Sequence, residues 1–406
     1  MSLTFRLLLI TFIESFATIC VERGVYFYSK ERLGFSPAEN LWMALGLGAM
    51  YVVGATASHG LSLRFRERMV LLVTIAGQMA VHLAMAGWPV RWMLFAGSAA
   101  IGLLNGAKWP VLESYISAGK APLEQAKAIG RFNISWALAV PLSIAAAGPM
   151  IAAWESLLFV AAAAMNLACI ALSWLLAARP EHLAEDHEAR PTVAQIDRLK
   201  ALLLANRWLM LASYSLMFLL APLLPEIFES LSVDSQIAPG LSGLMDCVRL
   251  AAFVVLGAWA AWHGRTYPVA WSLAAMPVGF FMILFGGNVA VVLAGEAIFG
   301  LAAGAVYYGA LYYAMVVKNA SVAGGGAHEG LIGLGFFLGP GAGLLAILVQ
   351  GQIQPAFARM FATSGAACAA SFSKIVATAV CVGPILIACS VAALWPLYRA
   401  RRLSRR

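Results

Sequence analysis

The sequence predicts an all-α integral membrane protein in which twelve transmembrane helices form two pseudo-symmetric six-helix bundles. The composition is the first reason, because 62% of the 406 residues are hydrophobic and only 11% are charged. A soluble globular chain is about 25% charged, so this chain has too few charges to cover a surface in contact with water. The number of long apolar segments and an internal repeat are the second and third reasons.

A transmembrane helix needs about 20 mostly apolar residues, and twelve segments of the chain meet this requirement. The first six segments are 5–28, 41–61, 68–87, 92–118, 126–149 and 154–178. After a hydrophilic stretch, the second six are 207–229, 240–262, 267–286, 289–316, 328–351 and 375–398. We therefore divide the chain into an N-terminal bundle, a cytoplasmic linker and a C-terminal bundle, at 1–178, 179–206 and 207–406.

Three segments need a separate justification. The first apolar segment carries Glu14, Glu22 and Arg23 and lacks a small-residue cleavage site, so we interpret it as a transmembrane helix and not as a signal peptide. The hydrophilic stretch 179–206 predicts a linker with an amphipathic helix along the membrane surface. The stretch 352–374 is semi-polar and rich in small residues, which predicts a loop or a short interfacial helix.

An internal repeat relates the two halves of the chain. Segment 101–120 aligns with the second half at an offset of 198 residues, so that Gly102 falls on Gly300 and Gly106 falls on Gly304. Two halves in the same orientation, related by an axis along the membrane normal, are typical of secondary transporters. The repeat therefore favours a transporter over a channel or a membrane enzyme.

The basic residues predict the orientation of the chain. Loop 59–68, the linker and the C-terminal tail carry twelve of the 27 Lys and Arg residues, and all three lie on one side of the predicted helices. Cytoplasmic loops of membrane proteins carry an excess of Lys and Arg. We expect a multi-pass protein of the bacterial inner membrane with cytoplasmic N- and C-termini. Topology thus accounts for the net charge of +8, and we expect no nucleic acid as a partner.

Loop 59–68 resembles a signature of the major facilitator superfamily, G-x-L-x-D-R-x-G-R-R, which joins the second and third helices of its members. Leu61, Arg64 and Arg68 match the signature, and Leu63 stands where the aspartate belongs. The resemblance covers essentially the whole chain. It implies the major facilitator fold, a mechanism of alternating access, and a monomer in the lipid membrane.

Two shorter segments are similar to proton-coupled oligopeptide transporters. Glu22 and Arg23 begin a stretch, ERGVYF, that resembles the E-R-F-S-Y-Y at the end of their helix-1 signature. Lys108 resembles the lysine of their fourth helix. Ile19 stands where the first glutamate of the signature would fall, and the two extra helices of the bacterial members are absent.

Ionisable residues at bilayer depth are costly and mark transport pathways or paired sites. The family resemblance directs most of them toward a central cavity. The predicted substrate-binding residues are Lys108, Trp109, Arg131, Asn133, Tyr308 and Tyr312. The predicted proton-coupling residues are Glu14, Glu22, Glu113 and Asp246, and the predicted gating residues are Arg23 and Arg249. Alternatively, Glu14 is a neutral hydrogen-bonded carboxyl, and the two tyrosines serve packing.

Several of these charges have a second interpretation as ion pairs. Asp246 and Arg249 are three residues apart, so they could form a structural pair or an outer latch on one helix face. Arg249 could instead pair across the two halves with Glu22, which would close the outer side. Glu113 and Arg131 could also pair with each other.

These observations predict a secondary active transporter that moves a small polar or anionic organic solute by symport or antiport. Protons are the expected coupling ion, because the membrane segments contain several carboxylates. The alternatives are proton-driven efflux of amphiphilic drugs and, from another class, a non-transporting receptor or assembly factor. The sequence contains no phosphate loop, nucleophile elbow or metal-ligand spacing. We therefore expect no enzymatic activity, no cofactor and no metal site.

Overall fold

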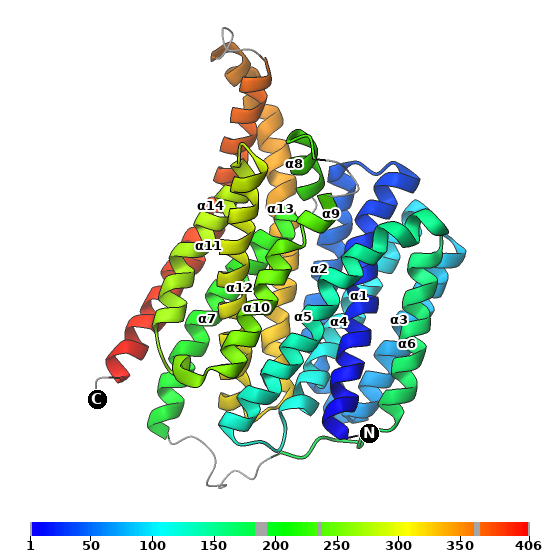
Figure 1. Cartoon of the computed structure of the whole chain (residues 1–406), viewed down its shortest axis with the longest axis vertical. Helices are drawn as coiled ribbons and strands as arrows, with labels where there is room; N and C mark the ends of the chain where they lie inside the picture. Colours follow the sequence, from blue (N-terminus) through cyan, green and yellow to red (C-terminus); the bar gives the residue numbers. More distant parts are fainter. Residues whose placement is uncertain (1, 183–192, 222, 234–237, 361–365, 405–406) are drawn as a thin grey trace.

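The computed structural model describes residues 2–182, 193–221, 223–233, 238–360 and 366–404. Within these ranges the chain forms fourteen α-helices, one short 3-10 helix and no strand. Most helices run along the long axis of the molecule, and both chain ends lie at the bottom of Figure 1. The predicted all-α fold class is confirmed. We call the end of the bundle that holds the two termini the linker end.

The N-terminal half consists of six long helices, drawn from blue to green on the right of Figure 1. They are α1 (Leu3–Leu33), α2 (Pro37–Phe65), α3 (Glu67–Gly87), α4 (Arg91–Ser117), α5 (Pro122–Ala153) and α6 (Leu157–Trp174). Local sequence signals set their ends. Ser36 and Glu39 form a reciprocal capping box at the start of α2, and Gly34 ends α1 with a positive φ of 63°.

The C-terminal half contains six long helices and three short segments. The long helices are α7 (Val193–Leu220), α10 (Leu244–Ala258), α11 (Tyr267–Phe285), α12 (Val289–Val317), α13 (Val322–Met360) and α14 (Ala366–Leu403). The short segments are α8 (Leu224–Ser230), α9 (Ala238–Leu241) and η1 (Ala260–Trp262). The six long helices occupy the positions of the predicted spans seven to twelve.

Ten of these twelve helices are long and apolar enough to cross a membrane by length and composition alone. The other two are α4 and α10. Asn105 and Lys108 lower the hydropathy of α4, and α10 has only 15 residues. Helix α4 is largely buried under α2, α3 and α13, and the charged side chains of α10, Asp246 and Arg249, are buried although the opposite face of that helix is exposed.

Helix α7 begins earlier than predicted. The linker was predicted to contain a helix along the membrane surface, but from Val193 onward this segment forms the first turns of α7. Leu202 and Leu203 are buried, so the apolar face of the helix continues into the predicted linker. Residues 183–192 of that linker lie outside the described residues.

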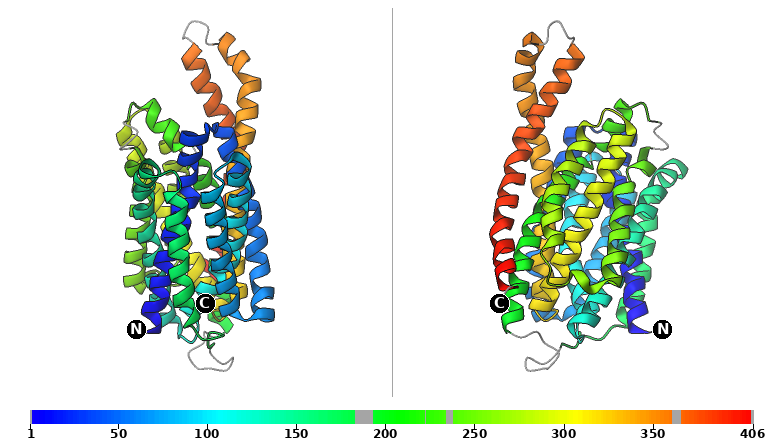
Figure 2. Two further views of the ribbon diagram at one scale, coloured as in Figure 1. Left: turned by 90° about the vertical axis from the view of Figure 1, so that its right-hand side faces the viewer. Right: turned by 60° about the vertical axis from the view of Figure 1, so that its left-hand side comes forward.

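Helices α13 and α14 extend well past the other helices at the end opposite the termini (Figure 1, Figure 2). Helix α13 has 39 residues, and at about 1.5 Å per residue it is about 58 Å long. The hydrocarbon layer of a bilayer is only about 30 Å thick. The segment 352–374 was predicted to be a loop or a short interfacial helix, but its described parts extend α13 to Met360 and begin α14 at Ala366. Alanine is the strongest helix former, and this segment is rich in it.

Glycine packing confirms the internal repeat. A Cβ atom added to Gly102 would lie 2.2 Å from the carbonyl oxygen of Leu47 on α2. In the second half, a Cβ atom added to Gly300 would lie 2.3 Å from the carbonyl oxygen of Met245 on α10. Gly300 and Met245 each lie 198 residues after their counterparts. The pair α4–α2 and the pair α12–α10 therefore use the same close contact.

Candidate functional site

A cavity of about 100 Å³ lies between the two halves of the molecule. Its walls come from α1, α2, α4 and α5 of the N-terminal half and from α7, α10, α12 and α13 of the C-terminal half. A cavity of this volume can hold several water molecules or a small organic group. The lining residues with polar or charged side chains are Ser15, Thr18, Glu22, Arg23, Trp109, Tyr51, Trp136, Tyr214, Arg249, Tyr307 and Glu329.

Aromatic side chains form a continuous wall around this cavity. The rings of Phe218 and Phe336 lie 3.6 Å apart between centroids, and Tyr214 stacks on Phe218. The Trp136 ring lies edge-on to Tyr307 at 5.2 Å. Aromatic faces offer a large apolar surface together with hydroxyl and indole N–H groups. The wall is therefore suited to an organic solute with an apolar body.

Two arginines face the cavity from opposite halves. Arg23 of α1 lies over the Phe218 ring at 5.1 Å, and no acidic side chain among the described residues forms an ion pair with it. Arg249 of α10 lies over Trp136 at 4.9 Å, and its Nη2 donates to Asp246 at 2.5 Å. Its Nε is buried without a hydrogen-bond partner. Both guanidinium groups therefore retain donors for an anionic group.

Two carboxylates also line the cavity. Glu22 is buried, and its Oε1 accepts a hydrogen bond of 2.6 Å from Asn105. Glu329 accepts a short hydrogen bond from the hydroxyl of Tyr51, across the interface between the halves. The predicted cross-domain pair of Glu22 with Arg249 is not formed, because Asp246 holds Arg249 on its own helix.

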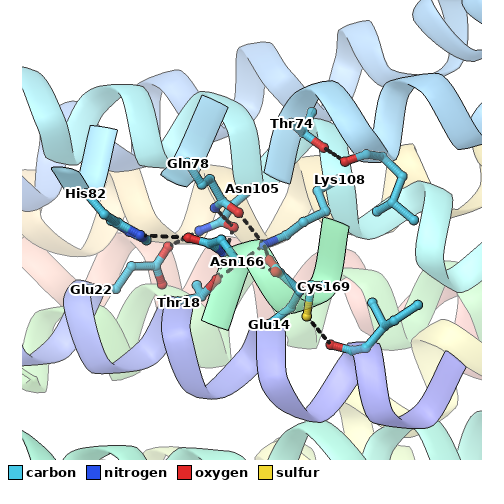
Figure 3. A network of polar contacts seen from close by, with 12 residues as sticks. Glu14, Thr18, Glu22, Thr74, Gln78, His82, Asn105, Lys108, Asn166 and Cys169 are labelled. Atoms are coloured by element: carbon cyan, nitrogen blue, oxygen red, sulfur yellow. Dashed lines mark hydrogen bonds and ion pairs between the residues drawn. The ribbon is translucent and has the colours of Figure 1, made fainter. Parts of the chain in front are cut away.

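A polar network extends from Glu22 into the N-terminal bundle (Figure 3). Asn105 connects Glu22 to Gln78, whose Oε1 accepts a hydrogen bond of 2.7 Å from Lys108. Lys108 also forms an ion pair of 2.6 Å with Glu14. Glu14 in turn accepts a hydrogen bond from Asn166, which contacts the His82 ring at 2.8 Å. These hydrogen bonds join α1, α3, α4 and α6, so they tie the N-terminal bundle together, while Nε2 of His82 is buried without a partner.

Lys108 and Glu14 do not reach the cavity. Both side chains have no exposed surface, and neither is a lining residue. Lys108 lies over the ring of Trp109 at 4.8 Å, and Trp109 does line the cavity. The pair that was predicted to bind substrate and to carry protons therefore lies one layer behind the wall, as a paired charge inside the N-terminal bundle.

Four other predicted substrate-binding residues also lie away from the cavity. Arg131 is exposed and lines a second cavity of about 320 Å³ between α1, α4 and α5 at the linker end. Asn133 accepts a hydrogen bond of 3.1 Å from the indole N–H of Trp136. Tyr308 and Tyr312 pack edge-on against Trp262. These two tyrosines therefore contact Trp262 at the linker end and do not line the cavity between the halves.

Tyr308 belongs to a set of contacts that join the halves at the linker end. Its hydroxyl donates to the carbonyl oxygen of Ala126 on α5 at 2.8 Å. Gly130 of α5 meets Gly257 of α10, where a Cβ atom on Gly130 would lie 3.1 Å from the Cα of Gly257. The hydroxyl of Ser114 donates to the carbonyl oxygen of Ala320 at 2.9 Å. The halves are therefore joined at this end by one close contact between backbones and by hydroxyl groups that donate to backbone carbonyls.

Glu113 does not pair with Arg131. Among the described residues, neither of its oxygens has a hydrogen-bond partner. It lies instead within 4.8 Å of ligand atoms of His328 and Glu329 on α13. Neither His328 nor Glu329 was predicted as a site residue, since they are more than 200 positions away from Glu113 in the sequence and no local spacing connects them.

Sequence reasoning also missed much of the aromatic wall. Tyr214, Phe218 and Phe336 line the cavity, but aromatic residues occur throughout the apolar segments. No periodicity separates those that face the cavity from those that face lipid. Only the packing of α7 against α13 brings these rings together.

Comparison with known proteins supports the same architecture. The family model described as "Major Facilitator Superfamily" matches residues 7–344. The crystal structure of the human organic anion transporter MFSD10 (TETRAN) superposes with a TM-score of 0.63 and 13% identity, over 98% of this chain and 100% of that chain. The crystal structure of a bacterial homolog of the human lysosomal transporter Spinster, in an inward-facing and unoccupied conformation, superposes with a TM-score of 0.64 and 13% identity. This likeness covers 99% of this chain and 98% of that chain.

No curated protein matches the sequence. The two structural likenesses are too low in identity to show more than the fold. The family model covers well over half of the chain, however, and it agrees with the predicted resemblance, with the repeat and with the central cavity. This chain therefore belongs to the Major Facilitator Superfamily, and it is a multi-pass membrane transporter and not an enzyme.

Proposed function

We propose that this protein is a secondary carrier that moves a small organic anion by alternating access and couples its transport to protons. The observation that carries the proposal is the pair of arginines, Arg23 and Arg249, in one cavity between the halves. An arginine binds a carboxylate or phosphate through two parallel N–H groups. Arg23 has no acidic partner among the described residues, so an anionic solute would supply one.

The position of the two arginines also supports alternating access. Arg23 contacts Phe218 of α7, and Arg249 donates to the sulfur of Met217 on the same helix at 3.4 Å. The two guanidinium groups thus approach neighbouring residues from different halves. A solute held by both would connect the halves, so its binding energy would act on their relative position.

Glu22 is the carboxyl that we assign to proton coupling. It lines the same cavity next to Arg23, and it is buried. Asn105 connects it to the polar network of the N-terminal bundle. When Glu22 is ionised it competes with the solute for the positive charge of Arg23, and when it is protonated it does not. Protonation would therefore favour binding of the anion.

The aromatic wall is the feature that supports a second candidate, proton-driven efflux of amphiphilic drugs. Trp109, Trp136 and Tyr214 could stack on a lipophilic cation. The two arginines oppose this reading, because a cationic solute would have to enter a cavity that already holds two guanidinium groups. Human MFSD10, which shares this fold, is described as an organic anion transporter.

The experiment is transport into proteoliposomes that contain a pH dye, with organic anions, zwitterions and lipophilic cations as solutes. For Arg23→Gln we expect at least a tenfold higher KM for the anion, which corresponds to the loss of one charged hydrogen bond of about 1.5–3 kcal/mol. Arg64→Gln, at an exposed position in the last turn of α2, is the matched control. For Glu22→Gln we expect exchange of the anion to persist while proton movement is lost.

The possible outcomes separate the candidates. Proton movement that only lipophilic cations elicit would replace this proposal with drug efflux. If the Arg23→Gln carrier has an unchanged KM for the anion, the arginine pair does not bind the solute. A folded protein that transports no solute of any class would support a receptor or an assembly factor instead.

We further propose that the linker end faces the cytoplasm of a bacterial inner membrane and that the carrier acts as a monomer. Arg64 at the end of α2, Arg66 between the helices and Arg68 at the start of α3 lie at this end, and an excess of basic residues marks the cytoplasmic side. A fluorescent reporter that folds only in the cytoplasm, fused to the C-terminus, tests the orientation. Absence of fluorescence from a full-length fusion would show that the C-terminus, and with it the linker end, faces the opposite side of the membrane.

A further inference from the structure

Three side chains of metal-ligating type meet in the interface between the two halves. Glu113 comes from α4, while His328 and Glu329 are neighbours near the start of α13. One ligand atom from each lies within 4.8 Å of the other two. All three side chains are buried, and the imidazole has no exposed surface. The transporter halves therefore bring together an acid–histidine–acid cluster that neither half possesses by itself.

The cluster has unused ligand atoms. Both oxygens of Glu113 and both ring nitrogens of His328 are buried without a hydrogen-bond partner. An unpaired buried polar atom is destabilising, so these four atoms indicate a missing partner. The His328 ring is held by Tyr307, which packs edge-on to it at 5.0 Å between centroids. This packing therefore holds the imidazole ring in place, and both of its nitrogens remain available to bind a ligand.

A cation at this position would balance the charge of the two carboxylates. Two carboxylates this close together do not both ionise unless positive charge is present. Among the described residues, no Lys or Arg forms an ion pair with Glu113 or Glu329. A doubly charged ion balances both carboxylates at once. One imidazole and two carboxylates form a donor set that binds first-row divalent ions such as Zn²⁺, Co²⁺ and Mn²⁺.

We propose that Glu113, His328 and Glu329 form a site for a first-row divalent metal ion that joins the two halves of the transporter. Ligand atoms at about 2.1 Å from one ion lie at most about 4.2 Å apart. The present separation is within 4.8 Å, so small side-chain rotations complete the site.

The backbone next to the cluster is adapted to this close approach. A Cβ atom on Gly325 would lie 2.5 Å from Oε2 of Glu113 and 3.0 Å from the Cα of Pro110. A glycine at this position lets the start of α13 come close enough to α4 for the carboxylate to fit between them. The hydroxyl of Tyr51 fixes Glu329 from α2. The three ligands therefore sit on elements that pack directly on one another.

The ion would act on the conformational equilibrium. Its ligands come from both halves, so it binds the state in which α4 and α13 touch and stabilises this state by mass action. Separation of the halves at the linker end removes Glu113 from the other two ligands. A bound ion is therefore expected to slow any transport cycle that requires this end to open.

The test measures metal binding directly, so it does not depend on the proposed solute or on proton coupling. Purified full-length protein, with its affinity tag removed and chelator washed away, is titrated with Co²⁺ and Zn²⁺ in a calorimeter. The Co²⁺ absorption spectrum reports the ligand geometry. The variants are Glu113→Gln and Glu329→Gln. Glu296→Gln is the matched control, since Glu296 is a buried carboxyl on α12 whose oxygens also lack partners.

We expect one ion per protein, and at least a hundredfold weaker binding in each of the two ligand variants, because even outer-shell substitutions weaken metal sites by about 10–100-fold. Binding to Glu296→Gln should equal that of the wild type. The proposal is wrong if the wild type binds no ion, in which case the two carboxyls share a proton. It is equally wrong if Glu113→Gln binds as tightly as the wild type, or if all three variants lose binding together.

Discussion

Lys108 and Arg23 are both cations inside the membrane bundle, yet their surroundings differ completely. Lys108 has no exposed surface and donates to Glu14, Gln78 and Thr18. Arg23 lies over the ring of Phe218 and forms no ion pair with an acidic side chain of the described residues. A buried ion requires complete pairing, and a binding group requires unpaired donors. The two residue types are chemically alike, so only their partners separate a structural role from a binding role.

Replacement of Lys108 by methionine should destabilise the fold. It leaves Glu14 buried without its ion-pair partner, and removal of one partner from a buried pair costs about 3–5 kcal/mol. The double variant Lys108→Met/Glu14→Gln removes both charges and should recover most of this loss. Thermal unfolding in detergent measures the change. A double variant as unstable as the single variant would show that Lys108 stabilises the fold through contacts other than its ion pair with Glu14.

At the scale of the helix, glycines decide how closely neighbouring helices approach. A Cβ atom on Gly54 would lie 2.0 Å from the carbonyl oxygen of Leu103, and one on Gly106 would lie 2.2 Å from that of Tyr51. At these two positions the backbones of α2 and α4 therefore contact each other directly, because a glycine contributes no side chain from either helix. Membrane helices associate without a hydrophobic driving force between them, so close backbone packing supplies much of their stability.

Replacement of Gly106 by alanine should lower the stability of the transporter by about 1–3 kcal/mol, the usual result of overpacking a tight interface. Gly46 on α2 has no atom within 4 Å of its added Cβ atom, so Gly46→Ala is the matched control. It should be neutral or stabilising by up to about 1 kcal/mol, because alanine favours the helix. Melting temperatures of both variants in detergent give the comparison. Equal losses in the two would contradict the packing argument.

At the scale of the molecule, the two halves touch at the linker end and enclose the cavity beyond it. Gly130 of α5 meets Gly257 of α10, and Tyr308 of α12 donates to Ala126 of α5. The Glu113 and Glu329 carboxyls meet in the same interface. These contacts lie between the halves and not within them, so they can separate without disruption of either bundle. This is what a two-state motion of rigid halves requires.

Replacement of Gly257 by tryptophan should hold the linker end open, because an indole does not fit where the two backbones touch. Spin labels at Lys127 on α5 and at Arg265 after α10, both exposed, report the separation of the halves. We expect the distance distribution to shift to longer values and transport to fall at least tenfold.

Gly46→Trp, in a position where the added Cβ atom meets nothing, is the control for that experiment. It should leave both the distance distribution and the transport rate unchanged. An unaltered distance in Gly257→Trp, with the protein folded, would mean that the linker end does not open during transport.

The candidate site was only partly predictable. Glu22, Arg23, Trp109 and Arg249 were identified as membrane-embedded groups and do line the cavity. Arg131 was identified by the same reasoning but is exposed at the linker end. Charge at bilayer depth selects residues that need a partner, and it does not reveal whether the partner is another side chain or a solute.

The sequence by itself determined the twelve membrane helices, the two repeated halves and the family, because each depends on local properties of the chain. Hydropathy acts over about 20 residues, and the repeat is visible as glycines at a constant offset. Only the tertiary structure decided which charges pair and which remain free. Lys108 meets Glu14, and Glu113 meets His328. These partners are 94 and more than 200 residues apart, and the physics that joins them is helix packing, which no local pattern records.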